Sequence, residues 1–442
     1  MSFARYPKYK DSGVEWLGEV PTHWEIARIK ASVASCRNGI WGSEASGDDE
    51  DIPCVRVADF DRNRLVVDQV PPTIRNISAR EREGRLLNSG NLLLEKSGGG
   101  EGQPVGCIVL YDCDASVVCS NFVARMEMRS GMAPSFWRYV HAAAYSVRLT
   151  TRSINQTSGI QNLDQHRYFN ERAAFPPAEE QSAIASFLDR ETAKIDALIA
   201  EQEKLIALLK EKRQALISHA VTKGFDPNAP MKDSGIEWLG RVPAHWNVAR
   251  LGTIFREVSD VGAEDLPILS VSIHDGISDK ELDEAEMDRK VTRSEDRSKY
   301  KAVQPGDLAY NMMRAWQGGF GAVMVAGQVS PAYVVARPIG EVCTSFIEQL
   351  LRTPQAVEQM RRHSRGVTDF RLRLYWEEFK NIRVALPPLP EQHAILDAAA
   401  VETTKFDSLV GEAVGAIELL KERRAALISA TVTGKIDVRN AT

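Results

Sequence analysis

Two corresponding stretches of the chain carry side chains suited to contact with DNA. Residues 359–373 contain one aspartate, Asp369, and five arginines: Arg361, Arg362, Arg365, Arg371 and Arg373. Guanidinium groups pair with guanine edges and with phosphates. Residues 148–162 are less charged, but they contain candidates for contact with base edges: Arg148, Thr151, Arg152, Asn155 and Gln156. A solvated loop is the simpler interpretation of any single residue, whereas the recurrence of such residues at corresponding places favours DNA.

Further candidates lie outside these two stretches. Residues 289–301 contain six basic side chains, Arg293 among them, against Glu295 and Asp296. Two other segments combine polar side chains with glycines, which either let the backbone approach a groove or simply form tight turns. The candidate contact residues in these segments are Lys96, Asn311, Arg314, Trp316 and Gln317.

Residues with catalytic potential form no complete set. His23 and His245 recur in one motif, but only Glu15 and Glu237 recur beside them, so each histidine is interpreted as structural. Glu378-Phe-Lys380 after Asp369 is only a weak match to a metal-nuclease carboxylate set. The chain has no Gly-x4-Gly-Lys-Ser/Thr loop for phosphates and no Asn/Asp-Pro-Pro-Tyr segment. We therefore expect no catalytic residue and no metal site.

Composition indicates a multidomain chain in the cytoplasm. Its 442 residues are 43% hydrophobic and 26% charged, and no apolar run reaches the roughly 18–20 residues of a membrane helix. The six cysteines form no Cys-x-x-Cys pair, which predicts reduced thiols. The net charge of −5 argues mildly against DNA binding. If the chain binds DNA, the positive charge that contacts the phosphates has to be concentrated in particular segments.

Internal repeats define the organisation of the chain. Residues 10–29 and 232–251 are identical at 14 of 20 positions, an offset of 222. A longer repeat begins at Pro176 and again at Pro387, an offset of 211. The blocks between the repeats, about 30–175 and 252–386, resemble each other far less. The chain thus contains the same frame of a short and a long repeat twice, with a different block between the repeats in each copy.

Each long repeat predicts a helix of about 40 residues that begins after Pro-Pro and ends near Gly224 or Gly434. An apolar stripe at three- and four-residue spacing predicts that the two helices pair as a coiled coil. The predicted seam consists of Leu188, Ile195, Leu198, Leu205, Leu209 and Leu216 in the first copy and Ala399, Phe406, Leu409, Ala416, Leu420 and Leu427 in the second.

The order of the repeats suggests a closed arrangement. If the first short repeat packs against the last helix, the chain forms a ring with pseudo-two-fold symmetry, which suits two DNA half-sites. The blocks themselves read as mixed α+β. Their candidate strands are residues 52–57, 91–95, 106–110, 116–124, 266–271, 307–311 and 322–325.

These features together resemble the specificity (S) subunit of type I restriction–modification systems. The resemblance covers essentially the whole chain and rests on SGVEWLGEVPTHWE and SGIEWLGRVPAHWN, on PPAEEQSAIASFLD and PPLPEQHAILD, and on the helix ends KEKRQALISHAVTKG and KERRAALISATVTGK. Within the second block, GDLAYNMMR and VSPAY also resemble the recognition domains of this family.

The resemblance implies an α+β fold with two mixed α/β target-recognition domains, separated by two long antiparallel coiled-coil helices in a pseudo-two-fold, circular repeat. We expect a short repeat with the first recognition domain in residues 1–175 and the first long helix in 176–229. A second short repeat with its recognition domain would occupy 230–386, and the second long helix 387–442. Each domain would read half of a split DNA site, and the helices would set the spacing.

The implied partners are double-stranded DNA, two modification (methyltransferase) subunits, and restriction subunits that act as translocase and nuclease. The resemblance implies no cofactor in this chain; S-adenosylmethionine, ATP and Mg²⁺ would belong to the partners. Two alternatives remain open. A self-contained nuclease or methyltransferase would be active without partners, and a coiled-coil scaffold would bind DNA without regard to its sequence.

Overall fold

The computed structural model describes residues 4–100, 102–157, 159–262, 266–273, 276–278, 299–366 and 372–439. Contacts divide the chain into two units, Met1–Lys204 with Val414–Thr442 (unit 1) and Leu205–Ala413 (unit 2). Two long helices, α4 (Ala178–Lys223) and α9 (Leu389–Val432), contribute one half to each unit. None of the described helices combines the length and apolar character that crossing a membrane requires.

The long helices begin and end where the sequence predicts. Both start directly after a Pro-Pro pair, whose first residue is held extended by the proline that follows it. Gly224 follows the end of α4 with φ +74°, and Gly434 follows the end of α9 with φ +71°. These left-handed conformations favour glycine and stop each helix.

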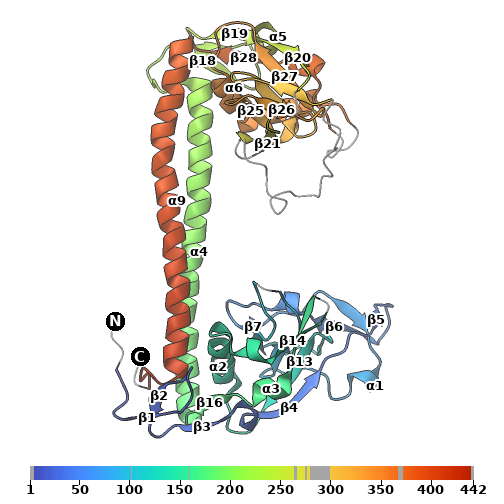
Figure 1. Ribbon diagram of the computed structural model, residues 1–442, viewed down its shortest axis with the longest axis vertical. Coiled ribbons are helices and arrows are strands. Elements are labelled where there is room, and N and C mark those ends of the chain that lie inside the picture. Colours follow the sequence, from blue (N-terminus) through green and yellow to red (C-terminus); the bar gives the residue numbers. More distant parts are fainter. Residues whose placement is uncertain are drawn as a thin grey trace. The chain divides into compact units, whose positions relative to one another are not determined.

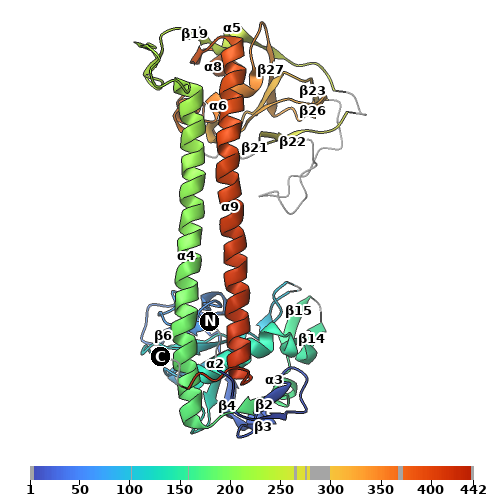
Figure 2. The ribbon, with the colours of Figure 1, turned by 90° about the vertical axis from the view of Figure 1, so that its left-hand side faces the viewer.

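Within each unit the two helices lie side by side and run antiparallel (Figures 1 and 2). In unit 1, Leu188 of α4 shares a hydrophobic cluster with Val432 of α9, and Arg424 Nε lies 3.1 Å from Asp196 Oδ1. In unit 2, Arg213 Nε lies 3.0 Å from Asp407 Oδ1. Asp407 and Arg424 follow Asp196 and Arg213 by 211 positions, so the two ion pairs correspond.

The buried seam differs in part from the predicted one. Leu198, Leu205 and Leu409 are 51%, 42% and 46% exposed. In α4 the more buried positions instead continue from Ile195 in alternating steps of four and three, through Ile199, Gln202 and Ile206 to Leu209. The prediction chose the wrong member of two adjacent apolar pairs, Leu198–Ile199 and Leu205–Ile206. Of the other predicted seam residues, Leu188, Ile195, Leu209 and Ala399 are buried, and Leu216, Phe406, Ala416, Leu420 and Leu427 are half-buried.

Unit 1 carries a core of three sheets in its variable block. The strand orders are β4-β13-β9-β11-β7, β12-β6-β8-β5 and β10-β15-β14. The strands are β4 (Val33–Asn38), β5 (Ser43–Glu44), β6 (Asp51–Val55), β7 (Val66–Val67), β8 (Ile74–Asn76), β9 (Leu92–Glu95), β10 (Ser97–Gly98), β11 (Ile108–Tyr111), β12 (Val118–Cys119), β13 (Val123–Met128), β14 (Ile154–Thr157) and β15 (Ile160–Leu163). The helices of the block are η2 (Val57–Asp59), α1 (Ala79–Arg82), α2 (Pro134–Ser146), η3 (Leu149–Ser153) and α3 (Gln165–Phe169).

Unit 2 builds its block on a smaller sheet, β20-β27-β24-β25, together with the two-stranded sheets β21-β22 and β23-β26. The strands are β20 (Phe255–Val258), β21 (Ser270–Ser272), β22 (Gly276–Ser278), β23 (Lys301–Val303), β24 (Leu308–Asn311), β25 (Phe320–Ala322), β26 (Gly327–Val329) and β27 (Tyr333–Pro338). The helices are α5 (Leu251–Ile254), η4 (Ala315–Gln317), α6 (Thr344–Leu351), α7 (Pro354–His363) and α8 (Trp376–Phe379). The predicted strands match best at β6, β9, β11 and β24, whereas predicted residues 322–325 meet β25 only at Ala322.

The short repeats build the same frame in both units. In unit 1, β1 (Tyr9–Asp11) pairs with β2 (Glu19–Pro21), and β3 (Glu25–Arg28) pairs with β16 (Arg172–Phe175); η1 (Ile29–Ala31) follows β3. In unit 2, β17 (Met231–Asp233) pairs with β18 (Arg241–Pro243), and β19 (Asn247–Arg250) pairs with β28 (Arg383–Leu386). Each frame thus joins a short repeat to the strand that leads into a long helix.

A Glu–Gln pair at the start of each long helix connects the frame to its block. His23 Nε2 lies 2.9 Å from Glu180 Oε2, and His245 Nε2 lies 2.7 Å from Glu391 Oε2. The neighbouring glutamine accepts a backbone N–H at the start of α2 or α6: Ala133 N to Gln181 at 3.0 Å, and Cys343 N to Gln392 at 2.9 Å. The histidines therefore do have recurring acidic partners, which are distant in sequence, and their contacts join structural elements.

The end of a long helix closes each frame. In unit 1, the Lys435 ammonium donates to the Glu19 carbonyl at 2.7 Å, and Asp437 N donates to the Ala4 carbonyl at 2.8 Å. In unit 2, the Lys223 ammonium donates to the carbonyls of Leu239, at 2.6 Å, and Arg241. The N-terminal short repeat thus packs against the end of α9, and the second short repeat against the end of α4.

Candidate nucleic-acid interface

A hairpin projects from the block of unit 1 at the first predicted polar stretch. Strands β14 and β15 pair with Asn155 opposite Asn162, and both residues are exposed. The hairpin is anchored to β10 by pairing of Ser97 with Asn162 and by the bond from Leu163 N to the Lys96 carbonyl at 2.8 Å. Amide side chains at such positions can bond to an adenine edge. Gln156 lies in β14, but its side chain is outside the described part of the structure.

A basic pocket of about 520 Å³ lies where this hairpin leads into α3. Lys96 donates to Asn38 Oδ1 at 2.8 Å, and the Arg85 guanidinium donates to the Asn38 carbonyl at 2.7 Å. Asp164 is occupied as the cap of α3, where its carboxylate accepts the backbone N–H of His166 at 3.0 Å. The basic side chains lining the pocket are Arg37, Arg85, Lys96 and His166. The pocket therefore offers mainly donors and positive charge, which suit phosphates or the guanine edge.

A buried ion pair lies next to Lys96 in the sequence. The Glu95 carboxylate receives the Arg62 guanidinium at 2.9 Å. Burial raises the pKa of Glu95, and the nearby Arg62 partly opposes this rise. Because Glu95 pairs with Arg62, Lys96 is the charged side chain of this segment that lines the pocket.

Unit 2 has a backbone bridge at the corresponding place, 211 residues later. Arg365 and Arg373 form an antiparallel bridge in which each backbone N–H donates to the other carbonyl at 2.9 Å. Leu374 N donates to the Met312 carbonyl at 2.9 Å, the counterpart of the bond from Leu163 to Lys96. Arg373 thus occupies the place that Asn162 occupies in unit 1. Arg371 lies outside the described residues, as does Arg293.

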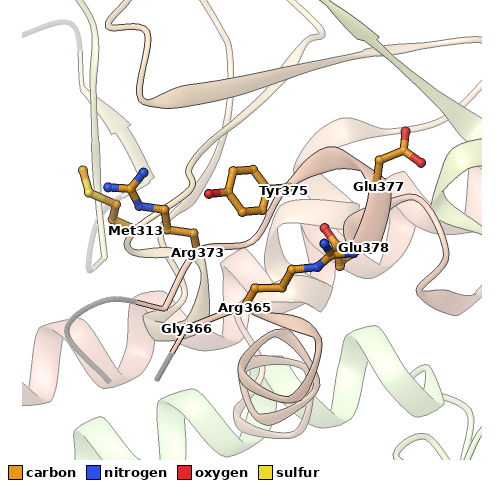
Figure 3. A pocket seen from close by; sticks show the side chains of 7 residues that line it. All are labelled: Met313, Arg365, Gly366, Arg373, Tyr375, Glu377 and Glu378. Atoms are coloured by element: carbon orange, nitrogen blue, oxygen red, sulfur yellow. Dashed lines mark ion pairs between the residues drawn. The ribbon is translucent and has the colours of Figure 1, made fainter. Parts of the chain in front are cut away.

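A pocket of about 900 Å³ opens beside this bridge, lined by Met313, Arg365, Gly366, Arg373, Tyr375, Glu377 and Glu378 (Figure 3). Arg365 extends toward Glu378 and pairs with it, whereas Arg373 extends the other way, toward Met313 (Figure 3). Both arginines are exposed, and the Arg373 side chain makes no hydrogen bond or ion pair with any described residue. The pocket thus combines two carboxylates with two guanidinium groups.

The remaining candidates of unit 1 divide into free and engaged side chains. Arg148 is exposed, has φ +56° and makes no side-chain hydrogen bond to the described residues. The Thr151 hydroxyl donates to the Arg148 carbonyl at 2.6 Å, and Arg152 lies 3.7 Å from Glu15. Arg148 is therefore better placed for an external contact than Thr151.

Most candidates in the loop after β24 of unit 2 stabilise that loop. Asn311 Oδ1 accepts Met313 N at 2.9 Å, and the Trp316 indole N–H donates to the Met313 carbonyl at 2.9 Å. Arg314 donates to Gln317 at 3.0 Å. On α7, Arg361 and Arg362 are exposed, and Arg362 Nε lies 3.3 Å from Glu358.

The weak match to a nuclease set has a simpler explanation. Glu378 pairs with Arg365, and Lys380 Nζ lies 2.7 Å from Glu377, while Asp369 lies outside the described residues. In the described part of the chain, no group of three or more His, Cys, Asp or Glu side chains is placed to hold a metal ion.

Several pocket residues were not predicted from the sequence. Arg37, Arg85 and His166 reach the unit 1 pocket from separate segments without a run of charge, so no local signal marks them. Tyr375 and Glu378 line the unit 2 pocket directly after the arginine-rich stretch. Extending the comparison of the two blocks beyond residue 373 shows that Glu378 corresponds to Arg167 at the offset of 211. This correspondence would have indicated both residues as candidate contacts.

Comparisons with known proteins identify relatives along nearly the whole chain, although no family model matches it. The chain is 21% identical over 443 residues to the type I restriction enzyme MjaVIII specificity subunit of Methanocaldococcus jannaschii, with 95% of each chain covered. It is 22% identical to the type I restriction enzyme EcoBI specificity subunit of Escherichia coli, over 73% of this chain and 70% of that one.

The chain has the same fold as a solved structure that concerns complex assembly and conformational transition of the type I R-M system. The TM-score is 0.59 at 16% identity, and the match covers 93% of this chain and 98% of that chain. Along nearly its whole length the chain is thus similar to specificity subunits of type I restriction enzymes.

Proposed function

We propose that this chain is the non-catalytic DNA-reading subunit of a type I restriction–modification complex, in which each block reads one half of a split site. One observation carries the proposal. The two units hold the segment that leads into α3 or α8 by the same backbone bond, at 2.8 Å in unit 1 and 2.9 Å in unit 2, yet present different side chains beside it. Asn162 in one unit corresponds to Arg373 in the other, and His166 corresponds to Glu377. A constant scaffold with variable contact residues is what two different half-sites require.

We further infer a pseudo-two-fold, circular repeat with the four segments 1–175, 176–229, 230–386 and 387–442. The corresponding ion pairs Asp196–Arg424 and Arg213–Asp407 support it, because a shift of 211 residues exchanges the helices that carry the acid and the base. The paired helices would then set the distance between the half-sites.

Leucines on the outer face of the helices supply a surface for the partners. Leu198 and Leu208 of α4 correspond to Leu409 and Leu419 of α9, and all four are exposed. Exposed apolar side chains that recur on a helix indicate a protein interface. Two corresponding surfaces fit two modification subunits, which would bind S-adenosylmethionine. Restriction subunits that use ATP and Mg²⁺ would complete the complex.

Exchange of one block tests this function. Residues 30–175 are replaced by the same block of another specificity subunit, and the modified motif is determined in the complex with modification subunits. Only one half of the motif should change, because the other block and both helices are intact. If both halves change, two independent reading blocks are excluded. A chain rebuilt with its own block serves as the control.

A further inference from the structure

Glu378 is an unusual member of the unit 2 pocket, because only half of its carboxylate is satisfied. One oxygen, Oε1, pairs with the Arg365 guanidinium. The other, Oε2, is shielded from solvent and has no hydrogen-bond partner among the described residues. A buried polar atom without a partner is unfavourable, and more so when it is charged. The free protein thus keeps an acceptor that a ligand could satisfy.

The partner of Glu378 is well placed to move. The Arg365 side chain is 73% exposed, whereas that of Glu378 is 13% exposed. An exposed guanidinium exchanges its contacts at little cost, because water replaces them. When Arg365 turns to DNA, the carboxylate beneath it becomes accessible at the pocket wall.

We propose that Glu378 is a specificity-determining residue of the second block, which accepts a hydrogen bond from the exocyclic amino group of a base while Arg365 moves onto the DNA. The proposal rests on the proposed function. Carboxylates accept from the amino group of cytosine, and the amino group of adenine offers the same donor. Arg365 pairs with the carboxylate and Arg373 lines the same pocket, so two cations offset the repulsion between the phosphates and the acidic side chains of the pocket.

Neighbouring positions distinguish Glu378 from an ordinary surface acid. Glu377 is 69% exposed and pairs with Lys380 at 2.7 Å, so it is satisfied without DNA. The residue of unit 1 that corresponds to Glu378 is Arg167, a donor with the opposite charge. On equivalent scaffolds this reversal gives the blocks opposite preferences at one position.

The test selects bound duplexes from a randomised pool, using the full-length chain with its modification subunits. Glu378→Gln should change the base preference at one position of one half-site by at least about tenfold, since a single good base contact contributes about 1–3 kcal/mol of discrimination. The other half-site should stay unchanged. Glu402→Gln, which alters an exposed pair with Lys405 on α9, is the matched control and should leave both halves unchanged.

Thermal unfolding separates this role from a structural one. Glu378→Gln should keep the melting temperature close to wild type, because the amide can still accept from Arg365. Glu378→Asp, which keeps the charge but shortens its reach, should also alter the preference. An unchanged motif in both variants overturns the role of Glu378 and leaves the proposed function intact. A wild-type complex that selects no split motif overturns both.

Discussion

Arg373 is the clearest candidate for a direct DNA contact in unit 2, because it is exposed and unpaired among the described residues. We expect Arg373→Ala to weaken binding to the cognate duplex by about 1–3 kcal/mol and to relax specificity at one position. Arg362→Ala should cost less, since Glu358 already engages that guanidinium at 3.3 Å. Binding of cognate and scrambled duplexes at one salt concentration measures both effects. Equal losses on both duplexes would show that Arg373 contacts only phosphates.

His141 gives unit 1 a predictable response to acid. The side chain is fully buried, its Nδ1 lies 2.7 Å from the Tyr168 hydroxyl, and burial lowers its pKa to about 3. The unfolded chain binds this proton near pH 6.5, so the stabilising difference is complete above about 6.5 and is lost as the pH falls toward about 3.

The slope attributable to His141 is at most about 1.4 kcal/mol per pH unit. We expect His141→Gln to remove this part of the pH dependence. Urea unfolding between pH 7 and pH 4 compares the variant with the wild type, so the carboxylates that titrate in both cancel. Parallel profiles would show that His141 does not bind the proton on unfolding.

The sequence marks which side chains can bond to DNA but not which ones remain free. Thr151, Asn311 and Trp316 have suitable chemistry, yet each makes a hydrogen bond within its own loop. Turn geometry decides this, and it depends on backbone angles that composition does not specify. Arg85 and His166 reach one pocket through the packing of separate segments, which no local pattern encodes.

At the scale of elements, α4 separates residues that stabilise the helix pair from residues available to partners. Leu209 is buried in the seam, whereas Leu205, four residues earlier, is 42% exposed. We expect Leu209→Ala to lower the free energy of unfolding by about 2–4 kcal/mol, as for a buried leucine. Leu205→Ala should change it by less than about 0.5 kcal/mol.

For binding of the modification subunit, we expect Leu205→Ala to have the larger effect and Leu209→Ala the smaller one. Leu205 lies about two turns after Leu198, on the same face of α4. Leu205→Ala should therefore weaken binding of the modification subunit, measured by calorimetry with the folded chain. If Leu205→Ala destabilises the isolated chain as much as Leu209→Ala does, the seam passes through Leu205 after all. If it leaves assembly unchanged, this face is not the docking surface.

The long helices could be predicted because their signals are local. Pro-Pro before Ala178 and Leu389, and a glycine after each helix, fix both ends. The seam was harder, because adjacent apolar residues fit two registers and only the facing helix distinguishes them. The role of Glu180 and Gln181 was missed, since their partners lie 157 and 48 residues away in sequence.

At the scale of the whole molecule, helix length should control the distance between half-sites. One heptad added to both α4 and α9 keeps the seam in phase and lengthens each helix by about 10 Å, roughly three base pairs of duplex. We expect the unspecified spacer of the motif to grow by about three base pairs with both halves retained. Four residues added to each helix, which breaks the phase, should instead abolish recognition. A spacer unchanged by the heptad would exclude the helices as the ruler.

Mapping of methylated bases in cells that express this chain with its modification subunit is the most direct measurement. Two reading blocks on one frame predict a split motif, with two defined halves separated by a fixed number of unspecified base pairs. A continuous motif, or methylation that does not depend on sequence, would contradict two-block recognition.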